Sequence, residues 1–359
     1  MKRILIISTV GLIYDGITSI ITSYLEAMDL SNLDVRVVGT IKVEPSIKKK
    51  IERCGCKIVG LPDRRKETLK YFLALWEYIR KEKIEVIHAH GNSGTLAVEM
   101  LAGYLGRAKK RIAHSHNTNC EQIKTDRILR PLFNILYTDA LACGEEAGKW
   151  LFGNRPFRIL TNGRDVEKYK FNLVMRDKMR KQYGLIDEFV IGHVGGFYRQ
   201  KNHVFLIEIF REVLKQKPDA MLFLIGDGPM KESIEKSAED IKRNIVFVGI
   251  TDHVEDYLNM MDAMVLPSLF EGLPLVVIEW QINGLPCLIS DVVTKDCEQT
   301  DMVYWLSLME SSQKWASVIC EIVDISNRKK LGIIGNRVIA NSIYNIKFSA
   351  DNLKKIYED

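Results

Sequence analysis

Short apolar runs alternate with longer stretches of helical periodicity along the whole chain. In the first half the apolar runs are 3–8, 35–38, 86–90, 111–115, 140–143 and 158–161. In the second half they are 189–194, 221–225, 245–248, 263–266 and 287–290. Strands buried on both faces have this continuous apolar character, and helices connect them in doubly wound parallel sheets. The pattern therefore predicts an α/β fold with two Rossmann-like halves.

The length of the chain supports a division into two domains. At 359 residues it exceeds what one hydrophobic core usually organises. The polar stretch 162–184 is the expected linker region, so we predict a first domain over 1–165 and a second over 166–343. A final helical run is expected over 344–359. A ligand would bind in the cleft that the two halves face.

Composition indicates an ordinary globular protein. Hydrophobic residues make up 47% and charged residues 27%, and no apolar run reaches the ~20 residues of a membrane helix. The start of the chain, 1–8, is interpreted as a first strand and not as a signal peptide. The seven cysteines are scattered, and only Cys54 and Cys56 lie close together, so no zinc site is completed. This usage suits a reducing cytoplasm.

Basic residues are concentrated in the first half. The stretch 42–83 holds 13 Lys and Arg against 6 Asp and Glu, although the net charge of the chain is only +5. Arg107, Lys109, Lys110 and Arg111 form a second cluster. An anionic membrane surface or a phosphate-bearing acceptor would suit these charges, and a solvated helix face explains them equally well. Nucleic acid is disfavoured, since no aromatic residues interleave the clusters.

Two glutamates flank a predicted junction between a loop and a helix. Seven residues separate Glu271 from Glu279, and Pro274, which favours the first turn of a helix, lies between them. The N–H groups of about Leu275 and Val276 would then be unpaired at the positive end of the helix, which favours an anion. A nucleotide sugar has a diphosphate for the helix start and hydroxyl groups for both carboxylates. Taken singly, Glu279 also fits a helix-surface carboxylate, and Glu271 a charge favoured by the helix dipole.

A second candidate loop, 195–202, follows the strand 189–194. Its glycines let the backbone approach a ligand closely. Lys201 could place an ammonium on a diphosphate and offset the charge of a leaving group. Asn202 is an expected N-cap for a helix whose apolar face contains Leu206, Ile209, Phe210, Val213 and Leu214.

The first half contains a glycine loop and two pairs of histidines. Gly11 and Gly16 have the spacing of a P-loop, but Ile17 stands where its lysine should be, and no G-x-G-x-x-G fingerprint is present. His88, His90, His114 and His116 lie at the carboxyl ends of two predicted strands, where ligands sit in open α/β sheets. A metal site is the minority interpretation, since no Asp or Glu ligand pattern adjoins them. His88 and His114 are expected to be hydrogen-bonded structural residues, and the role of His90 is left open.

The segment 262–290 resembles the donor-site signature of the retaining GT-B glycosyltransferases of family 4. It combines Glu271, Glu279, a Gly-x-Pro motif between them and a second Gly-x-Pro motif at 284–286. The segments 86–94, 111–118 and 142–153 resemble bacterial exopolysaccharide and capsule glycosyltransferases, and the resemblance covers nearly the whole chain. There are two departures, since Gly196 stands where the family usually has Arg, and Gly144 where it commonly has Ser.

The resemblance implies a GT-B fold, with an acceptor-side first domain onto which the last helix crosses back. By the family pattern, His116 contacts the donor sugar beside the acceptor, and His116, Glu271 and Lys201 are the catalytic candidates. The candidates for donor binding are Gly16, Gly196, Arg199, Lys201, Gly272, Leu273, Leu275, Val276 and Glu279. Either Arg199 replaces the arginine expected at position 196, or Lys201 acts with fewer partners. No Asp-x-Asp metal clamp occurs in the sequence, so we expect no metal and no cofactor.

The expected activity is retaining, metal-independent transfer of a hexosyl or N-acetylhexosaminyl group from a UDP-sugar. The expected acceptor is a saccharide linked to polyprenyl diphosphate, in exopolysaccharide or capsule biosynthesis. The protein would act in the cytoplasm, peripherally at the inner face of the plasma membrane. Two alternatives stay open: a non-hydrolysing UDP-sugar epimerase of the same architecture, and a nucleotide-sugar binding protein without turnover.

Overall fold

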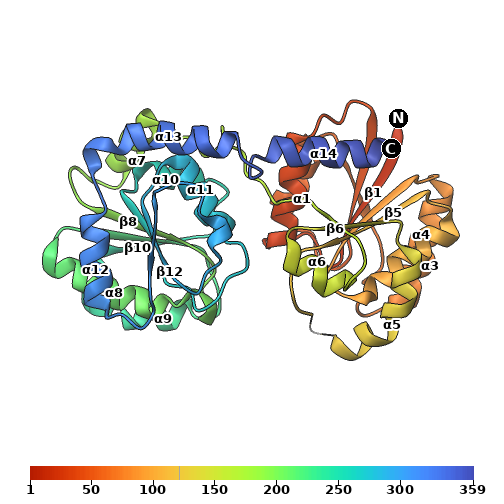
Figure 1. The fold of residues 1–359 in the computed structure, drawn as a ribbon, viewed down its shortest axis with the longest axis horizontal. Coiled ribbons are helices and arrows are strands. Elements are labelled where there is room, and N and C mark those ends of the chain that lie inside the picture. The colour runs from red at the N-terminus through yellow and green to blue at the C-terminus, as the bar shows by residue number, and fades with distance from the viewer. Residues whose placement is uncertain (121) are drawn as a thin grey trace. The chain divides into compact units, whose positions relative to one another are not determined.

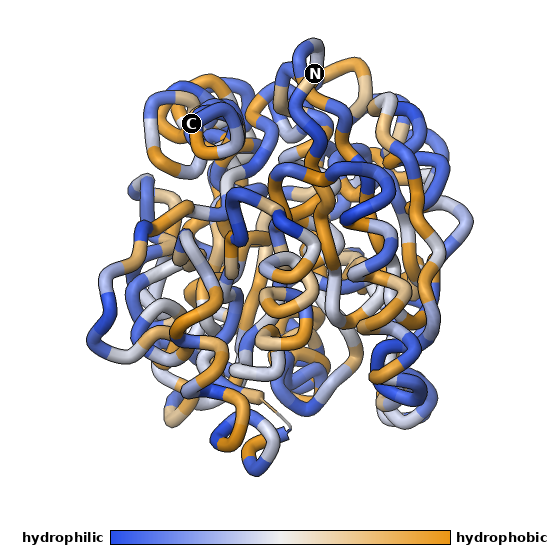
Figure 2. Tube along the Cα trace, turned by 90° about the vertical axis from the view of Figure 1, so that its right-hand side faces the viewer, coloured by the Kyte–Doolittle hydropathy of each residue, from blue (hydrophilic) through white to orange (hydrophobic). Residues whose placement is uncertain are grey.

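The computed structural model describes residues 1–120 and 122–359, apart from the side chain of residue 325 (Figure 1). It consists of two compact units, unit 1 with residues 1–163 and 346–359, and unit 2 with residues 164–345. Each unit is a parallel sheet with helices on both faces. Figure 2 shows hydrophobic residues concentrated in the strands and on one side of many helices.

Unit 1 contains a seven-stranded sheet in the order β3-β2-β1-β4-β5-β6-β7. Its strands are β1 Lys2–Ser8, β2 Leu33–Gly39, β3 Lys57–Gly60, β4 Val86–His90, β5 Lys110–Ser115, β6 Asp139–Ala142 and β7 Arg158–Ile159. Successive residues of β1 point to opposite faces, so Ile4 and Ile6 belong to one core and Leu5 and Ile7 to the other. Two separate sets of helices cover these cores.

The helices of unit 1 divide between the two faces of its sheet. α1 Gly16–Ala27, α2 Pro45–Arg53 and α14 Ile346–Glu358 contribute to the core with Ile4 and Ile6. α3 Thr68–Lys81, α4 Ala97–Gly106, α5 Ile123–Leu136 and α6 Glu145–Phe152 contribute to the core with Leu5 and Ile7. A 3₁₀ turn, Gly94–Leu96, precedes α4. The basic stretch 42–83 is therefore not one continuous patch, because α2 and α3 lie on opposite faces of the sheet.

Unit 2 contains a six-stranded sheet in the order β10-β9-β8-β11-β12-β13. Its strands are β8 Val190–Val194, β9 Met221–Ile225, β10 Ile245–Gly249, β11 Ala263–Leu266, β12 Cys287–Ser290 and β13 Val303–Leu306. The helices α7 Leu173–Gln182, α10 Val254–Met260, α11 Leu275–Asn283 and α13 Arg328–Ala340 pack on one face. The helices α8 His203–Gln216, α9 Lys231–Ser237 and α12 Ser312–Glu321 pack on the other. Short 3₁₀ segments are Arg199–Lys201, Glu239–Asn244, Lys295–Cys297 and Ile325–Asn327.

Every predicted strand is present, and two strands at sheet edges were missed. β3 and β13 are each only partly buried, so neither forms a continuous apolar run. The unit boundaries fall at 163/164 and 345/346, not at 165/166 and 343/344. Arg164 and Asn345 both belong to unit 2, because their backbones form a β-bridge and the side chain of Arg164 forms an ion pair with Glu279.

None of the helices that the structure describes has both the length and the apolarity needed to cross a bilayer. All seven cysteines are free thiols. Burial raises the pKa of several of them, that of Cys143 to about 11 and that of Cys56 to about 12, which keeps these thiols protonated.

Candidate functional site

The loop-to-helix junction of unit 2 forms as predicted. β11 ends at Leu266 and α11 begins at Leu275, directly after Pro274. The N–H group of Val277 donates to the carbonyl of Pro274 at 3.0 Å. Within the described chain, no group accepts a hydrogen bond from the N–H of Leu275 or Val276. Since these two donors lie at the positive end of the helix dipole, the junction can bind an anion.

Glu271 lies in this loop and holds Lys201. The Nζ atom of Lys201 lies 2.7 Å from Oε1 of Glu271, which also accepts from Oγ of Ser268 at 2.8 Å. Nε2 of Gln200 donates to the other carboxylate oxygen at 3.1 Å. The side chains of Glu271 and Lys201 are only 8% and 17% exposed. Two residues chosen from separate motifs are therefore brought together, because β8 and β11 are neighbours in the sheet.

The glycine loop after β8 makes close backbone contacts. A Cβ atom on Gly226, whose φ is +142°, would lie 2.1 Å from the carbonyl oxygen of Gly195. A Cβ atom on Gly196 would lie 2.7 Å from the ring of Tyr198. No larger residue fits at position 226 without a shift of the backbone, whereas at position 196 it would displace the exposed ring of Tyr198. The glycines thus hold the loop that carries Lys201 against the loop after β9.

Two details of this loop differ from expectation or stay open. Asn202 directly precedes α8, but its backbone is left-handed with φ of 54° and its side chain makes no capping hydrogen bond. The predicted side-chain cap is therefore wrong, although the helix and its apolar face are present. Arg199 is exposed and makes no ion pair with any described residue, so whether it replaces an arginine at position 196 stays a prediction. Gly272 is exposed and Leu273 half-buried in the neighbouring loop.

Glu279 is buried on α11 and faces Arg164. The residue is 5% exposed, and its Oε1 lies 2.6 Å from Nε of Arg164. The alternative of a helix-surface carboxylate is therefore wrong. Sequence reasoning missed Arg164, because it lies in the polar linker and 115 residues separate it from its partner.

Two histidines beneath the glycine loop were also missed. His193 donates from Nδ1 to the carbonyl of Val265 at 2.8 Å, and His203 stacks on Phe197 with ring centroids 4.2 Å apart. Burial lowers the pKa of His193 far below its usual value and that of His203 to about 4. Both imidazoles are therefore neutral and leave Lys201 and Arg199 as the cations of this loop.

In unit 1 the four predicted histidines form one buried cluster at the ends of β4 and β5. The ring nitrogens His90 Nδ1 and His116 Nε2 are 2.8 Å apart, and His88 Nε2 and His114 Nδ1 are 3.1 Å apart. His88 Nδ1 also lies 2.6 Å from the hydroxyl of Tyr357 on α14. Burial lowers the pKa of all four histidines, that of His116 to about 3. The cluster is therefore a neutral hydrogen-bonded stack at neutral pH.

Ligand nitrogens of His88, His90 and His114 lie within 4.8 Å of one another, close enough to share a metal ion. Both ring nitrogens of His88 already have hydrogen-bond partners, Tyr357 and His114. A metal ion would have to displace one of these hydrogen bonds. The expected structural role of His88 and His114 agrees with these contacts, and His90, which was left open, is the partner of His116.

A neighbouring loop fixes His116. Its backbone N–H donates to Oδ1 of Asn92 at 2.8 Å, and the carbonyl of Asn92 accepts from Nε1 of Trp150 at 2.8 Å. Asn92 and Trp150 were not singled out from the sequence.

Gly16, a predicted donor-binding residue, is the first residue of α1. A Cβ atom added there would have no described atom within 4 Å, and Asp15 caps the helix by accepting a hydrogen bond from the N–H of Thr18.

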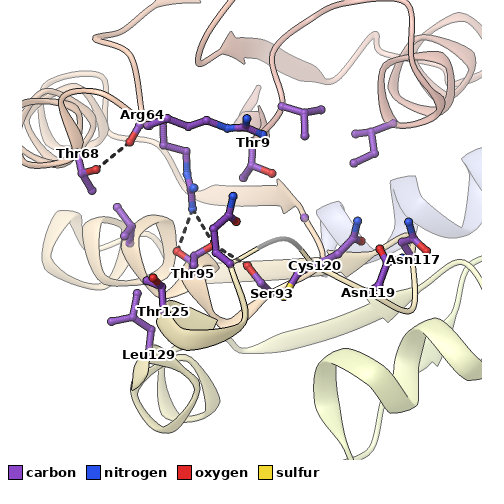
Figure 3. Close-up of a pocket in the computed structure, with 17 residues that line it drawn as sticks. Thr9, Arg64, Thr68, Ser93, Thr95, Asn117, Asn119, Cys120, Thr125 and Leu129 are labelled. Atoms are coloured by element: carbon purple, nitrogen blue, oxygen red, sulfur yellow. Dashed lines mark hydrogen bonds between the residues drawn. The ribbon is translucent and has the colours of Figure 1, made fainter. Parts of the chain in front are cut away.

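A polar pocket of about 520 Å³ lies in unit 1 (Figure 3). Its polar lining, among the described residues, comprises Thr9, Arg64, Arg65, Thr68, Asn92, Ser93, Thr95, Asn117, Asn119, Cys120, Gln122 and Thr125. Arg64 is neutralised by the fully buried Glu99, with Nε and Oε1 2.6 Å apart. Arg65 is exposed and makes no ion pair with a described residue. The pocket therefore offers hydroxyls and amides, with one available cation, which suits a hydroxyl-rich ligand.

A family model described as glycosyl transferases group 1 matches residues 188–324, the stretch that carries Lys201, Glu271 and Glu279. Among solved structures, that of Anabaena Alr3699/HepE in complex with UDP superposes with a TM-score of 0.78 at 16% identity and covers 100% of both chains. The two-unit architecture is thus the GT-B fold of that protein.

Curated relatives extend the match beyond unit 2. The UDP-Gal:alpha-D-GlcNAc-diphosphoundecaprenol alpha-1,3-galactosyltransferase of Escherichia coli is 25% identical over 325 residues, 82% of this chain and 80% of the relative. The putative glycosyltransferase EpsF of Bacillus subtilis (strain 168) is 33% identical over 259 residues, 68% of this chain and 67% of the relative. Because this identity extends over so much of both chains, the protein belongs to the group 1 glycosyltransferases and is a glycosyltransferase enzyme.

Proposed function

We propose that the protein transfers a sugar from a UDP-sugar to a saccharide linked to polyprenyl diphosphate, with retention of the anomeric configuration and without a metal ion. The names of its relatives support this choice, since one uses UDP-galactose and a diphosphoundecaprenol-linked acceptor. The proposed setting is exopolysaccharide or capsule biosynthesis at the cytoplasmic face of the membrane. The structure of the UDP complex with the same fold supports the nucleotide.

The observation that carries the proposal is the arrangement around the start of α11. Two unpaired N–H groups, at Leu275 and Val276, lie between Glu271 and Glu279 in the sequence. The diphosphate would accept from these N–H groups. Glu279 would accept a hydrogen bond from a ribose hydroxyl, and Glu271 from a hydroxyl of the donor sugar.

Lys201 would supply the positive charge that a metal ion supplies in other transferases. Its ammonium pairs with Glu271 at 2.7 Å, and a bound diphosphate would compete for the same cation. In the proposed reaction the bond between the anomeric carbon and the phosphate oxygen breaks, and the acceptor oxygen bonds to the same face of that carbon. The acceptor proton passes to the leaving phosphate. Lys201 and the helix N–H groups stabilise the charge that develops there.

His116 would position the donor sugar through a neutral imidazole. With its pKa lowered to about 3 by burial, the ring stays uncharged across the physiological range. His90 occupies Nε2 of His116, and Nδ1 is buried without a hydrogen-bond partner among the described residues, so the ring would have to turn before a nitrogen could meet a sugar hydroxyl. His90 thus fixes which tautomer His116 presents.

The polar pocket of unit 1 would receive the acceptor. Its hydroxyl and amide groups match the hydroxyls of a saccharide, and the exposed Arg65 would meet a phosphate of the acceptor. This assignment gives the two units different tasks, with nucleotide recognition in unit 2 and acceptor recognition in unit 1.

The test has two steps. A thermal-shift screen with UDP, GDP, ADP and their sugars should show the largest stabilisation with the uridine compounds, because at a given concentration the ligand with the lowest Kd stabilises the fold most. Transfer from the best donor to lipid-linked saccharides should then yield a product with the anomeric configuration of the donor. Formation of an epimeric UDP-sugar without acceptor would instead identify an epimerase. UDP binding without transfer to any acceptor of the panel would identify a binding protein.

A further inference from the structure

Helix α3 carries a second apolar stripe that faces solvent. Tyr71, Leu75 and Ile79 are fully buried and form the inner stripe. Leu69 and Leu73 follow the spacing i, i+4 on the outside, and Trp76, at i+7, is half-buried and also packs against the inner core. Leu69 is 71% exposed and Leu73 is 46% exposed, although a solvent-facing position of a helix normally carries a polar residue.

The neighbouring helices continue this apolar surface. α4 packs against both α3 and α5 and exposes Leu105. On α5, Ile128 and Ile135 are each 74% exposed and lie two turns apart. We call the surface formed by Leu69, Leu73, Trp76, Leu105, Ile128 and Ile135 the outer face.

Positive charges border the outer face. Lys66, Arg80, Lys81, Lys124 and Arg127 are exposed on α3 and α5 or next to them. Among the acidic residues near these helices, Glu99 is buried against Arg64, Asp126 pairs with Arg130, and Glu67, which precedes α3, pairs with Lys70. Glu77 of α3 is exposed and is the acidic exception on this surface. The guanidinium of Arg80 lies over the ring of Trp76, with its carbon 5.5 Å from the ring centre. Large apolar side chains fringed by Lys and Arg are typical of helices that lie in a membrane interface.

We infer that the outer face docks on the surface of a bilayer that contains anionic lipid. The apolar side chains would enter the boundary between headgroups and acyl chains, while the basic fringe meets the lipid phosphates. A second copy of the chain fits less well, because a symmetric contact would place the two basic fringes opposite each other. This inference rests on the proposed function in one respect. Thr68 of α3 and Thr125 of α5 line the pocket assigned to a lipid-linked acceptor, so the helices that would meet the membrane also border that pocket (Figure 3).

The outer face is distinct from the other basic segment of unit 1. Lys48, Lys49 and Lys50 belong to α2, which packs on the opposite face of the sheet. Lys48 lies 3.8 Å from Glu52, and Lys50 lies 3.1 Å from Glu26. The α2 lysines thus have acidic neighbours and no exposed apolar stripe beside them. They provide an internal control for charge alone.

The experiment is co-sedimentation of the full chain with vesicles of phosphatidylglycerol and phosphatidylcholine at low and physiological salt. The outer-face variant replaces Leu69, Leu73, Ile128 and Ile135 by Ser. Because these side chains are already exposed, the variant should fold, and its partition coefficient should fall at least ~10-fold. A matched control replaces Val174, Ile186, Ile333 and Ile343 of unit 2, which are all more than half exposed, and should bind vesicles like the parent. Charge reversal at Lys124 and Arg127 should weaken binding more than reversal at Lys48, Lys49 and Lys50.

Equal vesicle binding by the parent and the outer-face variant would overturn the inference, as would a parent that does not bind these vesicles. Sedimentation velocity should show the same oligomeric state for both proteins, and a parent dimer that the variant abolishes would assign the face to a second copy. UDP calorimetry on the same samples separates the two proposals. Vesicle binding without sugar transfer would leave the docking face in place and refute the proposed function.

Discussion

Ion pairs hold the candidate ligand-facing residues of unit 2, whereas hydrogen bonds between uncharged groups hold those of unit 1. In unit 2, buried or nearly buried ion pairs join Lys201 to Glu271 and Arg164 to Glu279. In unit 1, four histidines form a stack that burial keeps uncharged, beside a pocket of hydroxyl and amide groups. The same sheet-and-helix architecture thus supports a charged site in one unit and a nearly neutral one in the other.

This difference matches the chemistry of the two proposed ligands. A nucleotide diphosphate carries charge that must be neutralised, and cations are the groups that do so. Neutral donors and acceptors recognise the hydroxyls of a saccharide without the cost of burying a charge, and only the phosphate of the proposed acceptor would need a cation, the exposed Arg65. Four predictions test the comparison, from the largest expected effect to the smallest.

Acid should destabilise unit 1 through its histidine stack. The folded pKa values of His88, His90, His114 and His116 lie below the usual 6.5, so the unfolded chain binds protons there that the folded chain does not. The stability is therefore complete above pH 6.5 and is lost as the pH falls below it. The loss should reach about 5 kcal/mol by pH 5.5, at ~1.4 kcal/mol for each histidine per pH unit.

Urea denaturation at pH 7.5 and pH 5.5, followed by the fluorescence of Trp76 and Trp150 in variants that lack the other tryptophans, measures this loss. His253→Asn is the control, because the ring of His253 is 74% exposed. His253 lies in unit 2, so the variant should leave the stability of unit 1 unchanged at both pH values. A free energy of unfolding for unit 1 that stays constant between the two pH values would contradict a neutral buried stack.

Loss of the cation in unit 2 should reduce turnover. Lys201→Met should lower kcat by ~10²–10³-fold, because the leaving diphosphate loses its principal charge partner. Lys215→Met is the matched control, since Lys215 pairs with Glu212 at 2.7 Å on the exposed surface of the adjoining helix α8. Circular dichroism should show both variants folded. If Lys201→Met retains kcat within about threefold of the parent, the positive charge of Lys201 has no catalytic role.

Loss of the buried carboxylate on α11 should weaken nucleotide binding. Glu279→Gln should raise the Kd for UDP by about 10- to 100-fold, because a hydrogen bond to a charged group contributes ~1.5–3 kcal/mol. The double variant Arg164→Met with Glu279→Gln distinguishes two roles. If Glu279 serves only to neutralise Arg164, calorimetry should show parental affinity in the double variant, and the ribose contact would be refuted.

The sequence predicts the central strands well because their burial makes them distinctive. β9 and β11 have the predicted bounds, 221–225 and 263–266. The contact between Lys201 and Glu271 also follows from principle, since both residues come after strands of one parallel sheet, whose carboxyl ends meet at one edge. The edge strands β3 and β13 are half-exposed and therefore lack the apolar run on which the prediction depended.

Other contacts in both units were harder to predict. Arg164 was assigned to a linker, and only the folded chain brings it to Glu279. The hydrogen bond between His90 and His116 depends on the register of β4 against β5, which pairs His90 with His114. No local pattern encodes that register. The outer face was not predicted for a different reason. α3 has apolar residues on both sides, and only the packing shows which side is buried.

The smallest expected effect is also the most direct test, namely the action of EDTA on nucleotide binding and sugar transfer. In excess EDTA, the Kd for UDP and the rate of transfer should stay within about twofold of their values without it, since Lys201 and the helix N–H groups neutralise the diphosphate. Lys201→Met should weaken UDP binding equally with and without EDTA. Complete loss of activity in EDTA, restored by Mg²⁺ or Mn²⁺, would contradict the metal-free charge pairing proposed for unit 2.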